Sequence, residues 1–156
     1  MRKSFALISA LVFLCCGTFL ARSSTTQEQQ AIPDGWIKLD AGAFSLLGRK
    51  GWEFQREQGI DSYVGRFSSG DMKLEFDYGL YSSPLDDAKD PKYSIAHEIV
   101  DGREARIVCP RTPGHGVTGI YFRKTEGKNK LCLWGQDLNK SNQELAMRMF
   151  RTIRFP

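Results

Sequence analysis

The chain has 156 residues, 41% of them hydrophobic and 26% charged, which fits one globular domain and excludes a large multidomain enzyme. Three of the 22 basic residues and none of the 18 acidic residues lie in residues 1–23, so the formal charge of +4 arises mainly there. The rest of the chain is nearly neutral and carries no general electrostatic footprint for nucleic acid or acidic membranes.

The first 23 residues have the plan of a secretory signal peptide. Arg2 and Lys3 form a basic start, the uncharged segment Ser4–Ala21 is rich in Phe, Leu, Ile and Val, and small residues allow processing after Ser23. Residues 24–32 are polar without an apolar period, which predicts a flexible spacer. We therefore expect a secreted or periplasmic protein with a single domain over residues 33–156.

Two alternatives for the N-terminal segment stay open. Residues 4–21 approach the roughly 20 apolar residues that span a bilayer, so an uncleaved membrane anchor fits as well. A lipidated Cys15 or Cys16 is the third reading, although bulky residues stand at positions 12–14 where small ones are expected. Contact with a membrane is expected only through this segment, and only if it is retained.

Alternating apolar and polar residues predict strands in the first half of the domain. The pattern at Met72–Tyr78 is strict, and shorter apolar or alternating stretches occur at 44–47, 52–55 and 62–67. Residues 33–39 are read as a second, short helix. A long loop with two prolines covers residues 79–93.

Asp101-Gly102 stands between two strand-like stretches and predicts a two-residue hairpin. Outward pairing from that turn places His97 opposite Arg106 and Ile95 opposite Val108. Two further strands are expected over 117–124 and 130–134.

A helix is expected over about residues 142–151, because Ser141 and Glu144 have the spacing of a capping box. Its core-facing stripe pairs Leu145 with Met149 and Ala146 with Phe150. About seven strands joined mostly by tight turns, followed by this helix, define the expected fold class. It is α+β, with an antiparallel β-sheet packed against a C-terminal helix.

Two segments of this layout resemble the PsbP-like fold, named for an extrinsic subunit of photosystem II. One is Phe44-Ser45-Leu46-Leu47 followed by Gly51-Trp52, and the other is the ending 149–155. A proline common before Gly-Trp is replaced here by Arg49-Lys50. The resemblance implies an antiparallel sheet between helices, used mostly for binding and accessory roles, and it supplies no functional residues.

After processing, two cysteines remain. Cys109 and Cys132 invite a disulfide in an exported protein. A simple meander would separate them by two strands, or roughly 9–10 Å, beyond the limit of about 7 Å between Cα atoms for a bridge. Either the connection at 110–116 lets them meet or both are small core residues. A Cys109–His115 nucleophile pair is a third reading, and it would make the protein a thiol enzyme.

The sequence holds no G-x-S-x-G elbow, phosphate-binding glycine loop, C-x-x-C or H-E-x-x-H motif, so it predicts no cofactor and no zinc site. Asp86, Asp87 and Asp90 could bind Ca²⁺ weakly, but the neighbouring lysines favour a solvated loop.

Aromatic residues give the remaining functional signal. Tyr121 and Trp134 are expected on the sheet face opposite the core, and Tyr81 lies in the adjoining loop. Left uncovered, that face would suit a protein, a peptide or a hydrophobic ligand, whereas a covering loop would turn the rings into a second core layer. Three functions follow: a non-catalytic binding or accessory domain, a small hydrolase or thiol enzyme at Cys109 and His115, or a membrane-anchored envelope protein.

Overall fold

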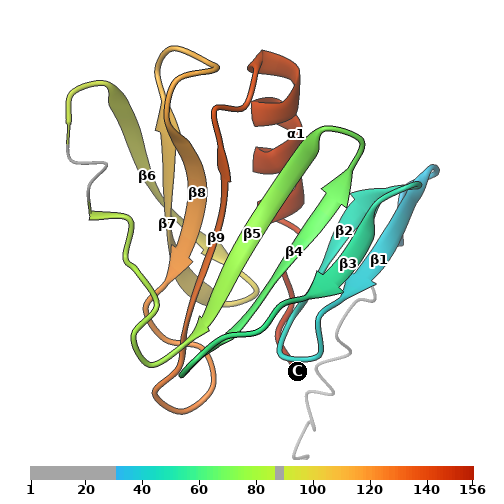
Figure 1. The fold of residues 1–156 in the computed structure, drawn as a ribbon, viewed down its shortest axis with the longest axis vertical. Coiled ribbons are helices and arrows are strands. Elements are labelled where there is room, and N and C mark those ends of the chain that lie inside the picture. The colour runs from blue at the N-terminus through green and yellow to red at the C-terminus, as the bar shows by residue number, and fades with distance from the viewer. Residues whose placement is uncertain (1–30, 87–89) are drawn as a thin grey trace, which may run out of the picture. The chain divides into compact units, whose positions relative to one another are not determined.

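The computed structural model describes residues 31–86 and 90–156, which belong to one compact unit, Ala31–Pro156. The predicted signal peptide and most of the spacer lie outside the described residues. The elements are the strands β1 to β9 and the helix α1 (Figure 1). In chain order they are β1 Trp36–Asp40, β2 Ser45–Arg49, β3 Glu53–Arg56, β4 Tyr63–Ser69, β5 Met72–Gly79, β6 Tyr93–Val100, β7 Arg103–Pro110, β8 Val117–Phe122, β9 Lys130–Gln136 and α1 Lys140–Phe150.

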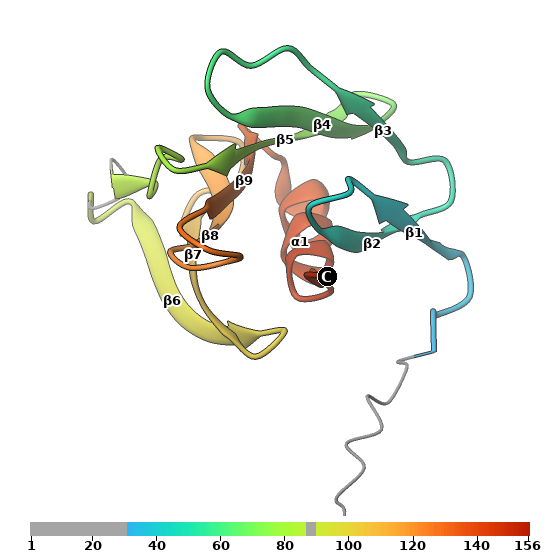
Figure 2. The same cartoon turned by 90° about the horizontal axis from the view of Figure 1, so that it is seen from below.

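Seven strands form one antiparallel sheet in the order β3-β4-β5-β9-β8-β7-β6. The chain runs from β3 to β5 by short connections, crosses to the far edge, and returns strand by strand until β9 pairs with β5. Figure 2 shows the sheet curving around α1 and the β1–β2 hairpin, which occupy its concave side. The predicted antiparallel sheet with a C-terminal helix is confirmed.

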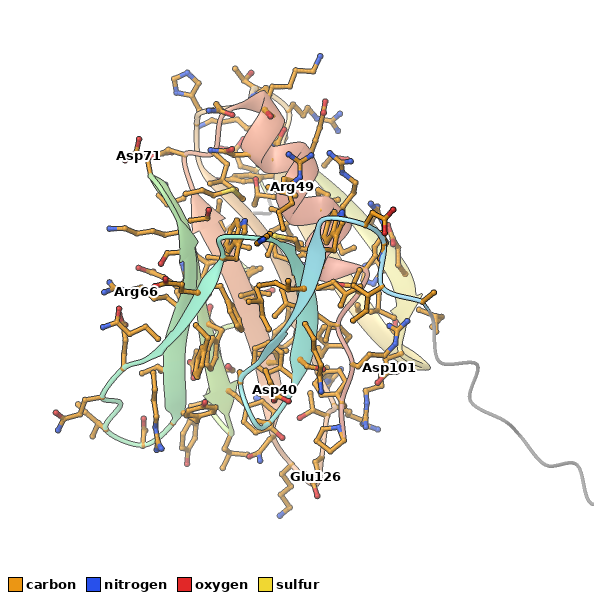
Figure 3. The ribbon with its side chains drawn as sticks, turned by 90° about the vertical axis from the view of Figure 1, so that its right-hand side faces the viewer. Asp40, Arg49, Arg66, Asp71, Asp101 and Glu126 are labelled. Carbon is orange, nitrogen blue, oxygen red and sulfur yellow. The ribbon has the colours of Figure 1, made fainter. Side chains whose placement is uncertain are left out.

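The prediction of a short helix at residues 33–39 is wrong, because strand β1 begins within this region at Trp36. β1 pairs with β2 in a separate two-stranded sheet, in which Leu39 lies opposite Leu46. Figure 3 shows this hairpin, with Asp40 at its turn and Arg49 at its open end. Pairing with a partner strand outweighs a weak local preference, since most of the stability of short elements comes from tertiary contacts.

Helix α1 begins two residues earlier than expected. Asn139 is its N-cap, and the Asn139 side chain accepts a hydrogen bond from the N–H of Asn142 at 3.0 Å, so Ser141 lies inside the first turn. Ala146, Met149 and Phe150 are fully buried against the sheet, and Leu145 packs partly buried beside them. The predicted core-facing stripe is therefore confirmed, although the predicted cap is wrong.

The core is aromatic near β3 and aliphatic near β7. Phe76 is 1% exposed, and its ring meets those of Phe44, Phe54, Tyr63 and Phe67 with centroids 5.0 to 6.1 Å apart. Toward the other edge the buried side chains are Ala105, Ile107, Ile120, Leu131 and Leu133. The β3 side of the sheet is therefore held by packed aromatic rings, and the β7 side by aliphatic side chains.

The β6–β7 hairpin has the predicted register, with His97 opposite Arg106 and Ile95 opposite Val108. Its turn residues Asp101 and Gly102 have φ angles of 52° and 69°, as a two-residue hairpin turn requires. Asp101 also accepts a hydrogen bond from the Phe155 N–H at 2.8 Å, so the turn is tied to the C-terminal segment (Figure 3).

That C-terminal segment in turn pairs with the N-terminal hairpin. The N–H of Ser45 donates to the Arg154 carbonyl and the N–H of Arg154 donates to the Ser45 carbonyl, both at 2.8 Å. The two ends of the domain are thus joined through backbone hydrogen bonds. No helix among residues 31–86 and 90–156 is long and apolar enough to span a membrane.

Candidate functional site

The two cysteines lie on opposite faces of the sheet. Cys109 follows Ile107 by two residues on β7 and therefore shares the concave, helix-covered face. Cys132 on β9 lies opposite Tyr121 and Asp77 on the convex face. Both thiols are free. The possible disulfide between them is absent because strand alternation points the two side chains to different sides of the sheet, in addition to the two-strand separation.

The thiol chemistry proposed for Cys109 lacks support in its surroundings. Burial raises the pKa of the Cys109 thiol, against a smaller lowering by the Thr118 hydroxyl, whereas a nucleophilic cysteine needs a lowered pKa. His115 lies in the loop before β8, where the Gly116 N–H is the main cause that lowers the pKa of Asp137 and His115 is a minor one. No hydrogen bond joins Cys109 to His115 within the described residues.

Burial raises the pKa of the Cys132 thiol to about 12, with a further contribution from the negative charge of Asp77. This thiol is fully buried, so it behaves as a small core side chain.

The acidic loop does not assemble a cation site in the part that the structure describes. Asp86 lies 3.3 Å from the Arg106 guanidinium, and Asp90 accepts the Lys92 N–H at 2.9 Å. That backbone hydrogen bond lowers the pKa of Asp90. Asp87 lies outside the described residues, and no group of three or more acidic, histidine or cysteine ligands occurs elsewhere in them.

Tyr121 and Trp134 lie on the convex face as predicted, but a loop covers them in part. Tyr121 is only 8% exposed and Trp134 is half-buried, whereas Tyr81 at the start of that loop is 75% exposed. Burial also raises the pKa of the Tyr121 hydroxyl. Together with Val108 and Cys132, Tyr121 forms a small second core layer, so the three aromatic residues do not form one open surface.

The covering loop, residues 80–86, is fixed to the sheet mainly by Arg106. Its guanidinium donates to the carbonyls of Pro84 at 2.6 Å and Leu85 at 3.2 Å. The Leu85 side chain sits directly over Gly119, where a Cβ would come within 2.7 Å of it. Ser82 adds a hydrogen bond to the Asp77 carbonyl. Glycine at position 119 is thus what lets the loop approach the sheet.

The surface that stays open is the outer side of β6. Ile95 is 42% and Ile99 is 72% exposed, and both lie on the convex face on either side of His97. The covering loop does not reach them, and β6 is the last strand of the sheet, with no neighbour beyond it among the described residues. An edge strand of eight residues with exposed apolar side chains is a feature that natural sheets usually avoid, because it invites further strand pairing.

The backbone of β6 is also prepared for pairing. In a two-residue hairpin the residues next to the turn, Val100 and Arg103, exchange backbone hydrogen bonds, and such pairs alternate along the strands. The N–H and C=O groups of Ile95, His97 and Ile99 therefore face outward, whereas the Tyr93 N–H donates to the Asp90 carbonyl at 2.9 Å. The exposed isoleucines and the outward backbone groups belong to the same residues, so a partner strand would meet both.

The inner side of β6 is held by an ion pair. The Arg151 guanidinium donates twice to Glu98, at 2.7 and 2.8 Å, and this lowers the pKa of Glu98. Arg151 also borders an open groove of about 480 Å³ between α1 and β7. The other residues that line the groove are Cys109, Gln143, Glu144, Met147 and Arg148. The ion pair leaves the β6 edge firmly oriented and its Glu98 charge neutralised.

Sequence reasoning did not single out Ile95 and Ile99. The alternation of 94–100 indicated only an ordinary half-buried strand. The available signal was that Ile95, His97 and Ile99 occupy one face, while the opposite-strand residues Arg106 and Glu104 on that same face are charged. The charged Glu104 opposite Ile99 indicates exposure to solvent at that end of the strand, whereas Ile95 lies opposite the apolar Val108.

Compared with protein-family models and with curated proteins, the chain matches none. The fold itself places it among α+β domains built on an antiparallel sheet.

Proposed function

We propose that this chain is an exported, non-catalytic binding domain that takes a polypeptide partner in extended conformation at the outer edge of β6. The observation that carries the proposal is the long open edge, on which outward backbone groups coincide with the exposed Ile95 and Ile99. Added strands gain affinity from backbone hydrogen bonds and specificity from alternate side chains.

Three further features support a binding role over catalysis. The sequence lacks recognised catalytic motifs, and the surroundings of Cys109 disfavour its thiolate. The resemblance to PsbP-like proteins implies an accessory role. The signal-peptide plan of residues 1–23 supports export, and mass spectrometry of the mature N-terminus tests this: a start near Ser24 supports cleavage, whereas an intact or lipidated N-terminus contradicts it.

A random-peptide display library panned on the mature domain tests the binding edge. We expect enrichment of peptides with alternating apolar residues, and loss of their binding to Ile99→Lys, because lysine on an edge strand opposes strand addition. Glu53→Lys on the opposite edge strand is the matched control and should bind normally. Equal binding to wild type and Ile99→Lys would contradict the assignment of this edge.

A further inference from the structure

The β6 edge has a pattern that fits its own copy. When a strand pairs antiparallel with an identical strand, a two-fold axis relates them, and continuous sheet faces require that opposite residues belong to the same face. The axis must then pass through a single residue. Near the middle of β6 this residue is either Ala96 or His97.

With the axis at His97, the apolar residues match. Ile95 of one copy lies opposite Ile99 of the other, and the symmetry repeats this pair on the other side of the axis. On the concave face Ala96 meets Glu98 and Ser94 meets Val100. Cross-strand pairs of β-branched residues stabilise sheets, and here both exposed isoleucines gain such a partner.

With the axis at Ala96, the match is poor. Ile99 would lie opposite Tyr93, but the Tyr93 hydroxyl accepts a hydrogen bond from the Val117 N–H at 3.2 Å and packs against Gly116. Because Val117 is on β8, two strands inward, the Tyr93 side chain is directed away from the outer edge. Ile95 would meet His97 rather than an apolar residue.

Charge also permits the pairing at His97. β6 contains no lysine, arginine or internal proline, the residues that commonly block edge pairing. Its one carboxylate, Glu98, is already paired with Arg151. In this register no two carboxylates and no two ammonium groups of β6 face each other.

We propose that the partner of β6 is the β6 strand of a second copy of this chain, paired antiparallel about a two-fold axis through His97. The proposal rests on the function proposed above and names its partner. The two seven-stranded sheets then form one continuous sheet across the dimer.

Sedimentation analysis of the mature domain tests the association. We expect a concentration-dependent dimer, and Ile99→Lys should raise its dissociation constant at least about tenfold, because each dimer contains two substituted edges. Glu53→Lys is the control and should leave the dimer intact. A dimer that Ile99→Lys does not weaken would overturn pairing through β6.

Cross-linking tests the register. In a Cys109→Ser background, His97→Cys should give a disulfide-linked dimer under mild oxidation, because directly opposed residues of paired strands have Cα atoms about 5.5 Å apart. Glu53→Cys in the same background is the control and should form no disulfide-linked dimer. A dimer in which His97→Cys fails to cross-link would overturn this register.

The outcomes separate this inference from the function on which it rests. A domain that stays monomeric at all concentrations, yet selects peptides that Ile99→Lys no longer binds, overturns self-pairing and keeps the proposed function. A domain that neither dimerises nor selects peptides overturns both.

Discussion

The two edges of the sheet are built in opposite ways. β3 has four residues, and three of them, Glu53, Gln55 and Arg56, are polar and exposed. Next to it Arg66, on the outer side of β4, bonds to both Gln55 and Glu57 (Figure 3). β6 has twice that length and exposes two isoleucines.

The difference separates a closed edge from an open one. Short length and charged side chains discourage further pairing, so β3 has the devices that natural sheets use against aggregation. Its one inward ring, Phe54, packs against Phe67 and Phe76 and anchors the strand to the aromatic core. β6 has no comparable anchor at its centre, and its apolar side chains gain burial only from a partner.

The largest expected effect comes from removing the aromatic anchor of the β3 side. Phe76→Ala should lower the free energy of unfolding by about 3–5 kcal/mol, because a fully buried ring that contacts four others is lost. Ile99→Ala should change it by less than about 0.5 kcal/mol, since that side chain is mostly exposed. Urea denaturation at low protein concentration measures both, and a similar loss for the two variants would break the comparison.

A smaller loss of stability is expected from a substitution that disturbs Tyr93, the first residue of β6. Gly116 has a φ of +107°, and a Cβ there would collide with the Tyr93 hydroxyl, so Gly116→Ala should destabilise the fold by about 2 kcal/mol. Gly127→Ala is the matched control, because its φ is +61° with open space around it, and it should cost about 1 kcal/mol. Thermal unfolding compares them, and equal losses would show that the Tyr93 contact is unimportant.

The smallest effect concerns the ion pair that holds β6 to α1. Arg151 lowers the pKa of Glu98 from its ordinary 4.5, so the pair stabilises the fold above that pH and loses this contribution as the pH falls through the lowered value. Glu98→Gln should therefore be less stable than wild type by under about 1 kcal/mol at pH 7, and equally stable in strong acid. Denaturation series across pH measure this, with Glu53→Gln as the control. A difference that persists unchanged in acid would contradict the role of the pair.

The sequence predicted correctly those elements that are determined by a few neighbouring residues, such as a hairpin turn. Asp101-Gly102 fixed the β6–β7 register, because positive φ at both turn residues admits one hairpin geometry. The helix cap was placed two residues late, since Asn139 and Ser141 are both good cap residues and the capping-box spacing pointed to Ser141. Residues 33–39 were misassigned because their partner strand lies further along the chain.

The sequence did not predict the candidate surface, because its exposure depends on which part of the convex face the loop of residues 80–86 covers. Tyr121 and Ile95 both lie on the convex face, yet the loop held by Arg106 buries the first and stops short of the second. That loop is positioned by Gly119 and by backbone carbonyls, which leave no recognisable sequence motif. The cysteines are free because side chains alternate between the two faces of a strand, and the observed register places Cys109 and Cys132 on opposite faces.

The backbone hydrogen bonds between Ser45 and Arg154 have a consequence for biosynthesis. The first hairpin of the domain finds this neighbour only at Arg154, so the hairpin cannot dock until synthesis has reached that residue. The fold is therefore completed late in synthesis, after strand β9 and helix α1 have been made.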